Sequence, residues 1–181
     1  MPESPTVSVS NLSRYYGERA ALEDVSFDLF RGQTLVVFGG NGAGKSTLLR
    51  ILATLLRPHD GQVRVLGEDI PKDSWAVRGR IGLIGHDAML YRDLTARENL
   101  RFTAKLHRVE DSEVDRILER VELVDRADEP VRTFSKGMIQ RLAAARAMLP
   151  DPELLLHDEP LANLDPGPAM LLEPLIAAAP H

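Results

Sequence analysis

The chain has 181 residues, of which 44% are hydrophobic and 27% charged, and its formal net charge is −5. This length suits one domain, and the composition is too apolar for a disordered chain. The acidic balance argues against a nucleic-acid-binding surface, which needs a strongly positive field. The lack of cysteine excludes a disulfide framework, a thiolate metal site and a cysteine nucleophile.

Nothing in the sequence predicts insertion into a membrane. The longest purely apolar runs, such as 35–38, are far shorter than a membrane-spanning helix. The first residues contain neither the basic region nor the apolar core of a signal peptide. We therefore expect a cytoplasmic protein that works at a membrane only as a peripheral partner.

Short strands are expected in the first third of the chain. Apolar and polar residues alternate over 6–10 and 25–29, as in half-buried antiparallel strands. The continuous apolar run 34–38 predicts a strand that is buried on both faces. A helix should follow from about Ser46, with an apolar stripe that reaches Leu56 before Pro58 stops it.

The middle of the chain has a helical pattern. Residues 95–98 form a capping-box sequence that predicts a helix to about Leu106, and a second helix is expected near 112–124. The acidic residues between 110 and 129 are interpreted as the solvated face of a helical lobe. Further strands are expected where apolar runs start at Val63, Ile81 and Leu154, so the pattern indicates an α/β core with a helical insertion.

The strongest motif spans residues 39–47. It matches G-x-x-x-x-G-K-[ST] and lies between an expected strand and an expected helix, which is the context that a phosphate-binding loop requires. Backbone N–H groups of such a loop surround a polyphosphate, Lys45 would contact the β- and γ-phosphates, and Ser46 would place a hydroxyl on Mg²⁺. The predicted phosphate-contacting residues are Gly39, Asn41, Gly42, Ala43, Gly44, Lys45, Ser46 and Thr47.

Two carboxylates follow the apolar run 154–156. Asp158 stands where a strand that ends beside a phosphate loop would supply an anionic ligand for Mg²⁺. Glu159 could act as the general base that polarises an attacking water. His157 is interpreted as a buried neutral histidine with a local hydrogen bond rather than as a catalytic group.

The phosphate-loop motif and the carboxylate pair occur with further motifs in the order found in the ATP-binding subunit of ABC transporters, and the chain resembles that subunit. Residues 134–138 resemble the family's signature sequence, and 161–165 resemble the loop that follows the catalytic glutamate. Tyr16 stands where the family places an aromatic ring against adenine. Residues 82–99 are similar to the loop that links the core to the helical lobe and touches the membrane subunit.

The resemblance implies an α/β fold with a P-loop NTPase core, in which a mixed sheet and an antiparallel β subdomain accompany a helical signature subdomain. It implies one ATP-binding domain over 1–181, with a core lobe at 1–86 and 147–181 and a helical lobe at about 87–146. It also implies ATP and Mg²⁺ as cofactors, a transmembrane permease as partner, and a place on the inner face of the cell membrane.

The signature segment has an expected role in a dimer. Ser135 would cap the following helix, whose first residues then form an anion site. In the family this site closes over the γ-phosphate bound to a second ATP-binding subunit, in a head-to-tail dimer. By this resemblance the nucleotide-contacting residues include Ser135, Lys136 and Gly137.

The chain departs from the family pattern in two places. Phe134, Lys136 and Met138 replace the leucine, the second glycine and the glutamine of the usual L-S-G-G-Q signature. His86 occupies the position of the glutamine that reaches the metal and the water, and it either takes over that role or is a tolerated polar residue. The Gly-His pair here, together with the following residues 90–95, resembles the haem-exporter subunits of cytochrome c biogenesis and related exporters.

By resemblance, a further strand that ends in a switch histidine is expected after Asp165. His181 follows the last expected helix directly, so we expect a shortened domain that lacks one central strand, is marginally stable and hydrolyses ATP poorly. The alternatives to a transport ATPase are a truncated nucleotide-binding fragment and a soluble ABC-type ATPase that acts on ribosomes or DNA. The last is disfavoured by the acidic balance and by the lack of duplicated or basic segments.

Overall fold

The computed structural model describes residues 4–158, and these divide into two parts at residue 81. We call residues 4–81 the strand unit and residues 82–158 the helical unit, and we describe each by itself. Among residues 4–158, no helix combines the length and the apolar character needed to cross a bilayer.

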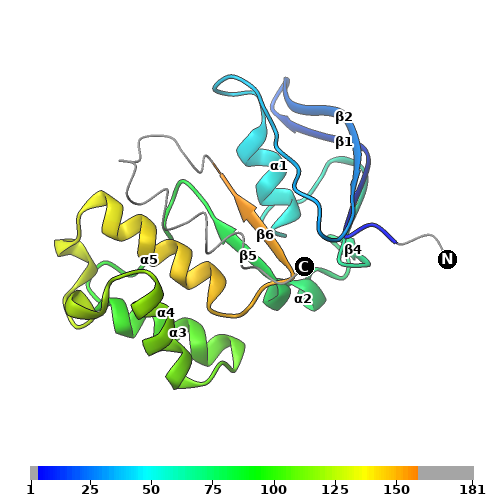
Figure 1. The fold of residues 1–181 in the computed structure, drawn as a ribbon. Helices are drawn as coiled ribbons and strands as arrows, with labels where there is room; N and C mark the ends of the chain where they lie inside the picture. The colour runs from blue at the N-terminus through cyan, green and yellow to red at the C-terminus, as the bar shows by residue number, and fades with distance from the viewer. Residues whose placement is uncertain (1–3, 159–181) are drawn as a thin grey trace. The chain divides into compact units, whose positions relative to one another are not determined.

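The strand unit contains a four-stranded antiparallel sheet in the order β2-β1-β3-β4 (Figure 1). Its strands are β1 (Val7–Tyr16), β2 (Arg19–Leu29), β3 (Asp60–Val65) and β4 (Glu68–Ile70). Val7 pairs with Leu29 on one side and with Val65 on the other, so β1 lies in the middle of the sheet. The side chains of Val7 and Val9 are buried, as their alternation with polar neighbours predicts.

Two helices accompany this sheet: α1 (Lys45–Leu52) and the short α2 (Ser74–Val77), followed by a 3₁₀ turn over Arg78–Arg80. Helix α1 buries Leu48, Ile51 and Leu52 on one face. It ends four residues earlier than the sequence predicts, because Thr54 takes up a left-handed backbone conformation with φ 61°. Leu55 consequently lies outside the helix and is largely exposed.

The predicted strand over residues 34–38 is wrong. These residues lie outside both sheets, and the exposed fractions of Val36 and Phe38 are 60% and 89%. An apolar run becomes a strand only when neighbouring strands supply hydrogen-bond partners. In the described part of the chain no strand pairs with this run.

The helical unit contains a two-stranded sheet of β5 (Ile81–Ile84) and β6 (Leu154–His157), which lie side by side (Figure 1). Its helices are α3 (Ala96–His107), α4 (Asp111–Arg120) and α5 (Lys136–Met148), with 3₁₀ turns over Val124–Arg126 and Val131–Thr133. The helices are therefore the ones that the sequence predicts, to within a few residues at each end.

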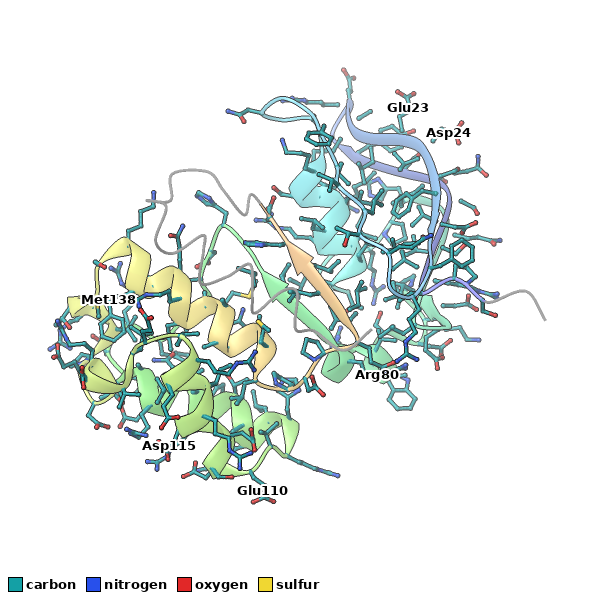
Figure 2. All side chains as sticks on the ribbon, viewed as in Figure 1. Glu23, Asp24, Arg80, Glu110, Asp115 and Met138 are labelled. Carbon is teal, nitrogen blue, oxygen red and sulfur yellow. The ribbon has the colours of Figure 1, made fainter. Side chains whose placement is uncertain are left out.

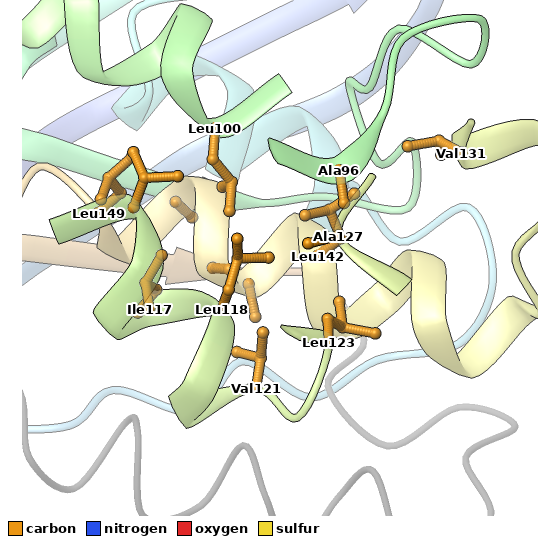
Figure 3. Packing of buried hydrophobic residues seen from close by; sticks show 14 of the residues in the cluster. Ala96, Leu100, Ile117, Leu118, Val121, Leu123, Ala127, Val131, Leu142 and Leu149 are labelled. Carbon is orange, nitrogen blue, oxygen red and sulfur yellow. The ribbon is translucent and has the colours of Figure 1, made fainter. Parts of the chain in front are cut away.

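An apolar cluster fills the space between these helices (Figure 3). Leu100 of α3, Leu118 of α4 and Leu142 of α5 are each buried to 1% exposure or less. Ile84 of β5 belongs to the same cluster, so the sheet and the helices of this unit share one core. The acidic side chains of α4 face the solvent, and Figure 2 shows Glu110 and Asp115 at the outer surface of the helices.

The buried amide of Asn99 connects α3 to the loop before it. Its Nδ2 donates to the carbonyls of Tyr91 and Thr95, both at 2.9 Å, and its Oδ1 accepts from the Tyr91 N–H at 2.8 Å. The side chain is only 3% exposed. Asn99 therefore satisfies backbone groups that would otherwise be buried without partners.

We expect Asn99→Ala to destabilise the protein by about 1–3 kcal/mol, because it leaves those backbone groups unsatisfied. The free energy of unfolding in urea measures the change. Leu106→Ala, on an exposed position of the same helix, should change it by less than about 0.5 kcal/mol. Equal effects of the two substitutions would show that the Asn99 bonds contribute nothing.

The capping box of α3 should make stability depend on pH. The Thr95 N–H donates to Glu98 Oε2 at 2.8 Å, and this bond lowers the pKa of Glu98. A lowered pKa gives stability that is present above the unfolded value of about 4.3 and is lost as the pH falls through the folded value. Between pH 5 and pH 3.5, Glu98→Gln should therefore lose less stability in urea unfolding than the unmodified chain. Parallel losses would contradict this.

Candidate functional site

In the phosphate loop, residues 39–43 are exposed and 44–47 are half-buried, and its last three residues form the first turn of α1. At the start of the helix, the Leu48 N–H donates to the Gly44 carbonyl at 2.9 Å. No side chain within residues 4–158 caps this helix. The N–H groups of its first turn are therefore available to an anion, and the helix dipole favours negative charge there.

Lys45 lies within its own loop. Its Nζ donates to the carbonyls of Gly39 at 2.8 Å and Gly40 at 3.1 Å. These neutral acceptors hold the ammonium group without neutralising its charge. A phosphate bound in the loop would offer a stronger, charged acceptor to the same donor.

The geometry at Gly44 explains why the last of the loop's glycines cannot be replaced by a larger residue. Its φ is +88°, and a Cβ at this residue would lie 2.1 Å from the carbonyl oxygen of Ala21 in β2. A side chain is therefore excluded both by the backbone conformation and by the close approach to β2. Gly40 in the same loop has no atom within 4 Å of such a Cβ.

Tyr16, the predicted adenine contact, ends β1 with a half-exposed ring. The guanidinium carbon of Arg14 lies 5.3 Å from the ring centroid. Arg14 is itself held by the Arg57 carbonyl, which accepts from Nη1 at 3.2 Å. A cation over the ring and an exposed ring surface are compatible with the stacking of a flat base.

Two other predicted residues lie at one edge of the sheet in the helical unit. The Asp158 N–H donates to the carbonyl of Ile84 at 2.9 Å, so β6 and β5 end beside each other. Asp158 directly follows β6, and His86 lies two residues after β5. The structure therefore brings the predicted Mg²⁺ ligand and the predicted water-positioning residue to the same sheet edge, where both follow strand ends.

His157 precedes Asp158 in the same strand. Burial lowers its pKa, and the Asp158 charge acts in the opposite direction, so the neutral ring is favoured as the sequence predicts. The predicted local hydrogen bond is not found for Nδ1, which is buried without a partner among the described residues.

The signature segment, residues 134–138, opens α5. The Ser135 hydroxyl accepts from the Met138 N–H at 3.3 Å, and this confirms the predicted cap. Ser135 and Lys136 are exposed, and Gly137 is half-buried. Met138 lies at the same end of the helix (Figure 2), so the segment presents its backbone N–H groups and a lysine at one helix end.

The predicted residues thus fall into two groups. The phosphate loop and Tyr16 belong to the strand unit, and His86, Asp158 and the signature segment belong to the helical unit. Glu159, the 161–165 segment and His181 lie outside the described residues. The roles of all these residues stay predictions.

The sequence analysis missed Arg146, whose half-buried guanidinium donates from Nη2 to the Leu83 carbonyl at 2.8 Å. Burial lowers the pKa of Arg146, and Asp87 acts in the opposite direction. A signal existed in the sequence. The arginine interrupts the apolar run 142–148, and a charge at such a position is buried only for a specific partner.

Comparison with known proteins identifies the family. The family model described as "ABC transporter" matches residues 22–162. The chain belongs to the ABC transporter family. Among the relatives of this ABC transporter domain is a daunorubicin resistance ATP-binding protein of Streptomyces coeruleorubidus, 41% identical over 88% of the chain and 52% of its own length. A bacitracin transport ATP-binding protein of Bacillus licheniformis is 38% identical over 90% and 54%.

Solved structures agree with the fold of the ABC transporter domain. A chain described as the ATP-binding subunit of an ABC transporter matches with a TM-score of 0.83 and 33% identity, over 94% of this chain and 73% of its own. A second chain, cbiO1 from Clostridium perfringens, described as part of the ABC transporter complex cbiONQ, matches with a TM-score of 0.78 and 27% identity, over 96% of this chain and 73% of its own. The predicted P-loop NTPase fold with an antiparallel β subdomain is confirmed.

The relatives differ from this chain in length, and their names differ from the predicted subfamily. The ABC transporter domain spans about half the length of the curated relatives it matches. The predicted likeness to haem exporters is not supported, because these relatives are named for daunorubicin resistance, bacitracin transport and, in Sinorhizobium fredii, Nod factor export. The Gly-His pair and residues 90–95, on which that likeness was based, are too short a segment to distinguish subfamilies.

The glycine geometry of the ABC transporter domain gives a prediction about its phosphate loop. Gly44→Ala should abolish the binding of a fluorescent ATP analogue, because the added Cβ collides with Ala21 and strains the left-handed backbone. Gly40→Ala is the matched control, since its Cβ meets open space. It should retain the binding within about threefold, a change of less than about 0.7 kcal/mol. Equal loss in both variants would contradict the steric explanation.

Proposed function

We propose that this chain binds and hydrolyses ATP as the nucleotide-binding domain of an ABC exporter. The observation that carries the proposal is the phosphate loop. It combines a helix start without a side-chain cap among residues 4–158, an exposed backbone over residues 39–43 and a lysine ammonium group held within the loop. In a member of the ABC transporter family, these features support the binding of the triphosphate of ATP.

The strand unit would supply most of the binding contacts. Backbone N–H groups of the phosphate loop and Lys45 would hold the phosphates after Lys45 leaves the carbonyls of Gly39 and Gly40. Tyr16 would stack on the adenine with Arg14 beside it. The Ser46 hydroxyl of the strand unit and the Asp158 carboxylate of the helical unit are each an oxygen ligand of the kind that Mg²⁺ prefers, and the resemblance to the family implies this ion.

The helical unit and the segment after it would supply the hydrolytic groups. Glu159 would accept a proton from the attacking water, and His86 would orient that water from the loop after β5. Bound Mg²⁺ would neutralise charge on the phosphate oxygens. The capped start of α5, with Ser135, Lys136 and Gly137, would contact the γ-phosphate held by a second ATP-binding subunit in a head-to-tail dimer.

The proposed partner is a transmembrane permease, with the chain on the inner face of the cell membrane. The assembly of the structural relative cbiO1 in a complex with other subunits supports this. The names of the relatives, which refer to daunorubicin, bacitracin and Nod factor, support a drug, antibiotic or Nod-factor-like cargo, which the permease would select.

A second candidate is a nucleotide-binding fragment with little ATPase activity. The exposed apolar run 34–38 favours it, because this run leads directly into the phosphate loop and lacks a partner strand within residues 4–158. A loop that is not supported by a sheet is held less rigidly, and catalysis depends on rigid positioning.

We expect Glu159→Gln to retain ATP binding and to lower kcat by about 10²–10⁴-fold, because it removes the proton acceptor. Lys45→Ala should instead weaken binding, since it removes the ammonium group from the phosphates. Steady-state phosphate release and equilibrium binding of a fluorescent ATP analogue separate the two effects. Binding by the unmodified chain without phosphate release would favour the second candidate. Absence of binding would overturn both.

A further inference from the structure

Arg146 is a half-buried charged residue whose helix neighbours belong to the apolar core of the helical unit. It lies in the last turns of α5 and is flanked along the helix by the buried residues Ala145 and Ala147. Burial lowers its pKa, which means that the surroundings disfavour the charge, although an arginine keeps it at neutral pH. A charge in such a place is costly unless it is well paired.

The pairing of Arg146 is incomplete. Nη2 donates to the Leu83 carbonyl, while Nε is buried and has no hydrogen-bond partner among the described residues. Replacing a partly paired buried charge by an apolar residue of similar size is often neutral or stabilising. Stability alone therefore does not explain this arginine.

Arg146 interacts with residues on either side of His86. It bonds to the carbonyl of Leu83 in β5, three residues before His86, and the charge of Asp87, which follows His86 directly, favours the charged form of Arg146 without a direct ion pair in the described structure. Asp87 also shapes the backbone here, since its Oδ1 accepts from the Met89 N–H at 3.2 Å. We call residues 85–89 the His86 loop.

We infer that Arg146 is a positioning residue that holds the His86 loop against α5. Its guanidinium fixes the end of β5 through a carbonyl and attracts the one carboxylate that folds the loop. The first residues of the same helix are the signature segment, capped by Ser135. If α5 moved, Arg146 would move with it and would shift the end of β5 and the His86 loop that follows. The catalytic role of His86 rests on the proposed function, whereas the positioning of the loop does not.

Helix α5 contains a matched control. Arg141 is also half-buried, and its Nη1 also donates to backbone carbonyls, those of Val121 at 3.1 Å and Glu122 at 3.3 Å. These carbonyls follow α4 and lie far from the His86 loop in sequence. Arg141→Met removes the same charge and the same kind of bond from the same helix.

The test compares Arg146→Met with Arg141→Met by amide hydrogen exchange at neutral pH. Arg146→Met should raise the exchange of the His86 loop at least tenfold, with the Met89 amide as the specific probe, because the Asp87 carboxylate loses its cation. The exchange of α4 should not change. Arg141→Met should leave the His86 loop unchanged. Arg146→Lys, which keeps the charge, should give an intermediate effect.

Thermal unfolding shows whether each variant remains folded, and if Arg146→Met unfolds, Arg146→Gln and Arg146→Lys decide the question in its place. An equal rise of exchange at the His86 loop in the Arg146 and Arg141 variants would overturn the inference, because it would show a general loosening. Unchanged exchange in every Arg146 variant would overturn it as well.

ATP turnover separates this inference from the proposed function. If His86 acts in hydrolysis, Arg146→Met lowers kcat without changing the binding of an ATP analogue, and adding His86→Ala to Arg146→Met causes no further loss. If His86→Ala alone leaves turnover unchanged, the proposed role of His86 fails. The exchange result still decides whether Arg146 positions the loop.

Discussion

The backbone N–H groups at the starts of helices are the constraint on which this structure depends. Each helix start leaves donors without intrahelical acceptors, and the chain treats them in different ways. Helix α3 satisfies them with the capping box of Thr95 and Glu98, and α5 uses the hydroxyl of Ser135. Helices α1, α2 and α4 have no side-chain cap in the described chain, but only α1 of these starts at a left-handed glycine. Helix α4 has Asp111 and Glu113 in its first turn, whereas α1 has no acidic residue there, so the start of α1 is the better place for a phosphate.

Local patterns in the sequence predicted much of the fold. The alternation around Val7 predicted β1, the capping-box residues predicted the start of α3, and the G-x-x-x-x-G-K-S spacing predicted the start of α1. These features depend on neighbouring residues alone. Strand β4 and helix α2, of three and four residues, were missed because they are shorter than the window in which a period can be recognised.

Features that depend on distant partners were not predictable in the same way. The apolar run 34–38 has the composition of a buried strand, but strand formation is decided by what lies beside it. The candidate site shows the same limit. The ends of β5 and β6 meet as the motif order implies, since Asp158 bonds to Ile84, yet no pattern predicted that Arg146 contacts Leu83 across 63 positions of sequence. Spacing identifies the residues of such a site, whereas packing decides which side chains support them.

The exposed run 34–38 has a consequence for the behaviour of the chain in solution. Leucine, valine and phenylalanine side chains, beside backbone groups that no strand within residues 4–158 pairs with, form the kind of segment that pairs with a copy of itself. Arg31 precedes the run, and the Lys45 ammonium group binds the carbonyls of Gly39 and Gly40 at its other end. Self-association at this run would occlude the approach to the nucleotide site. A preparation that self-associates through this run would therefore bind less ATP than a monomeric one.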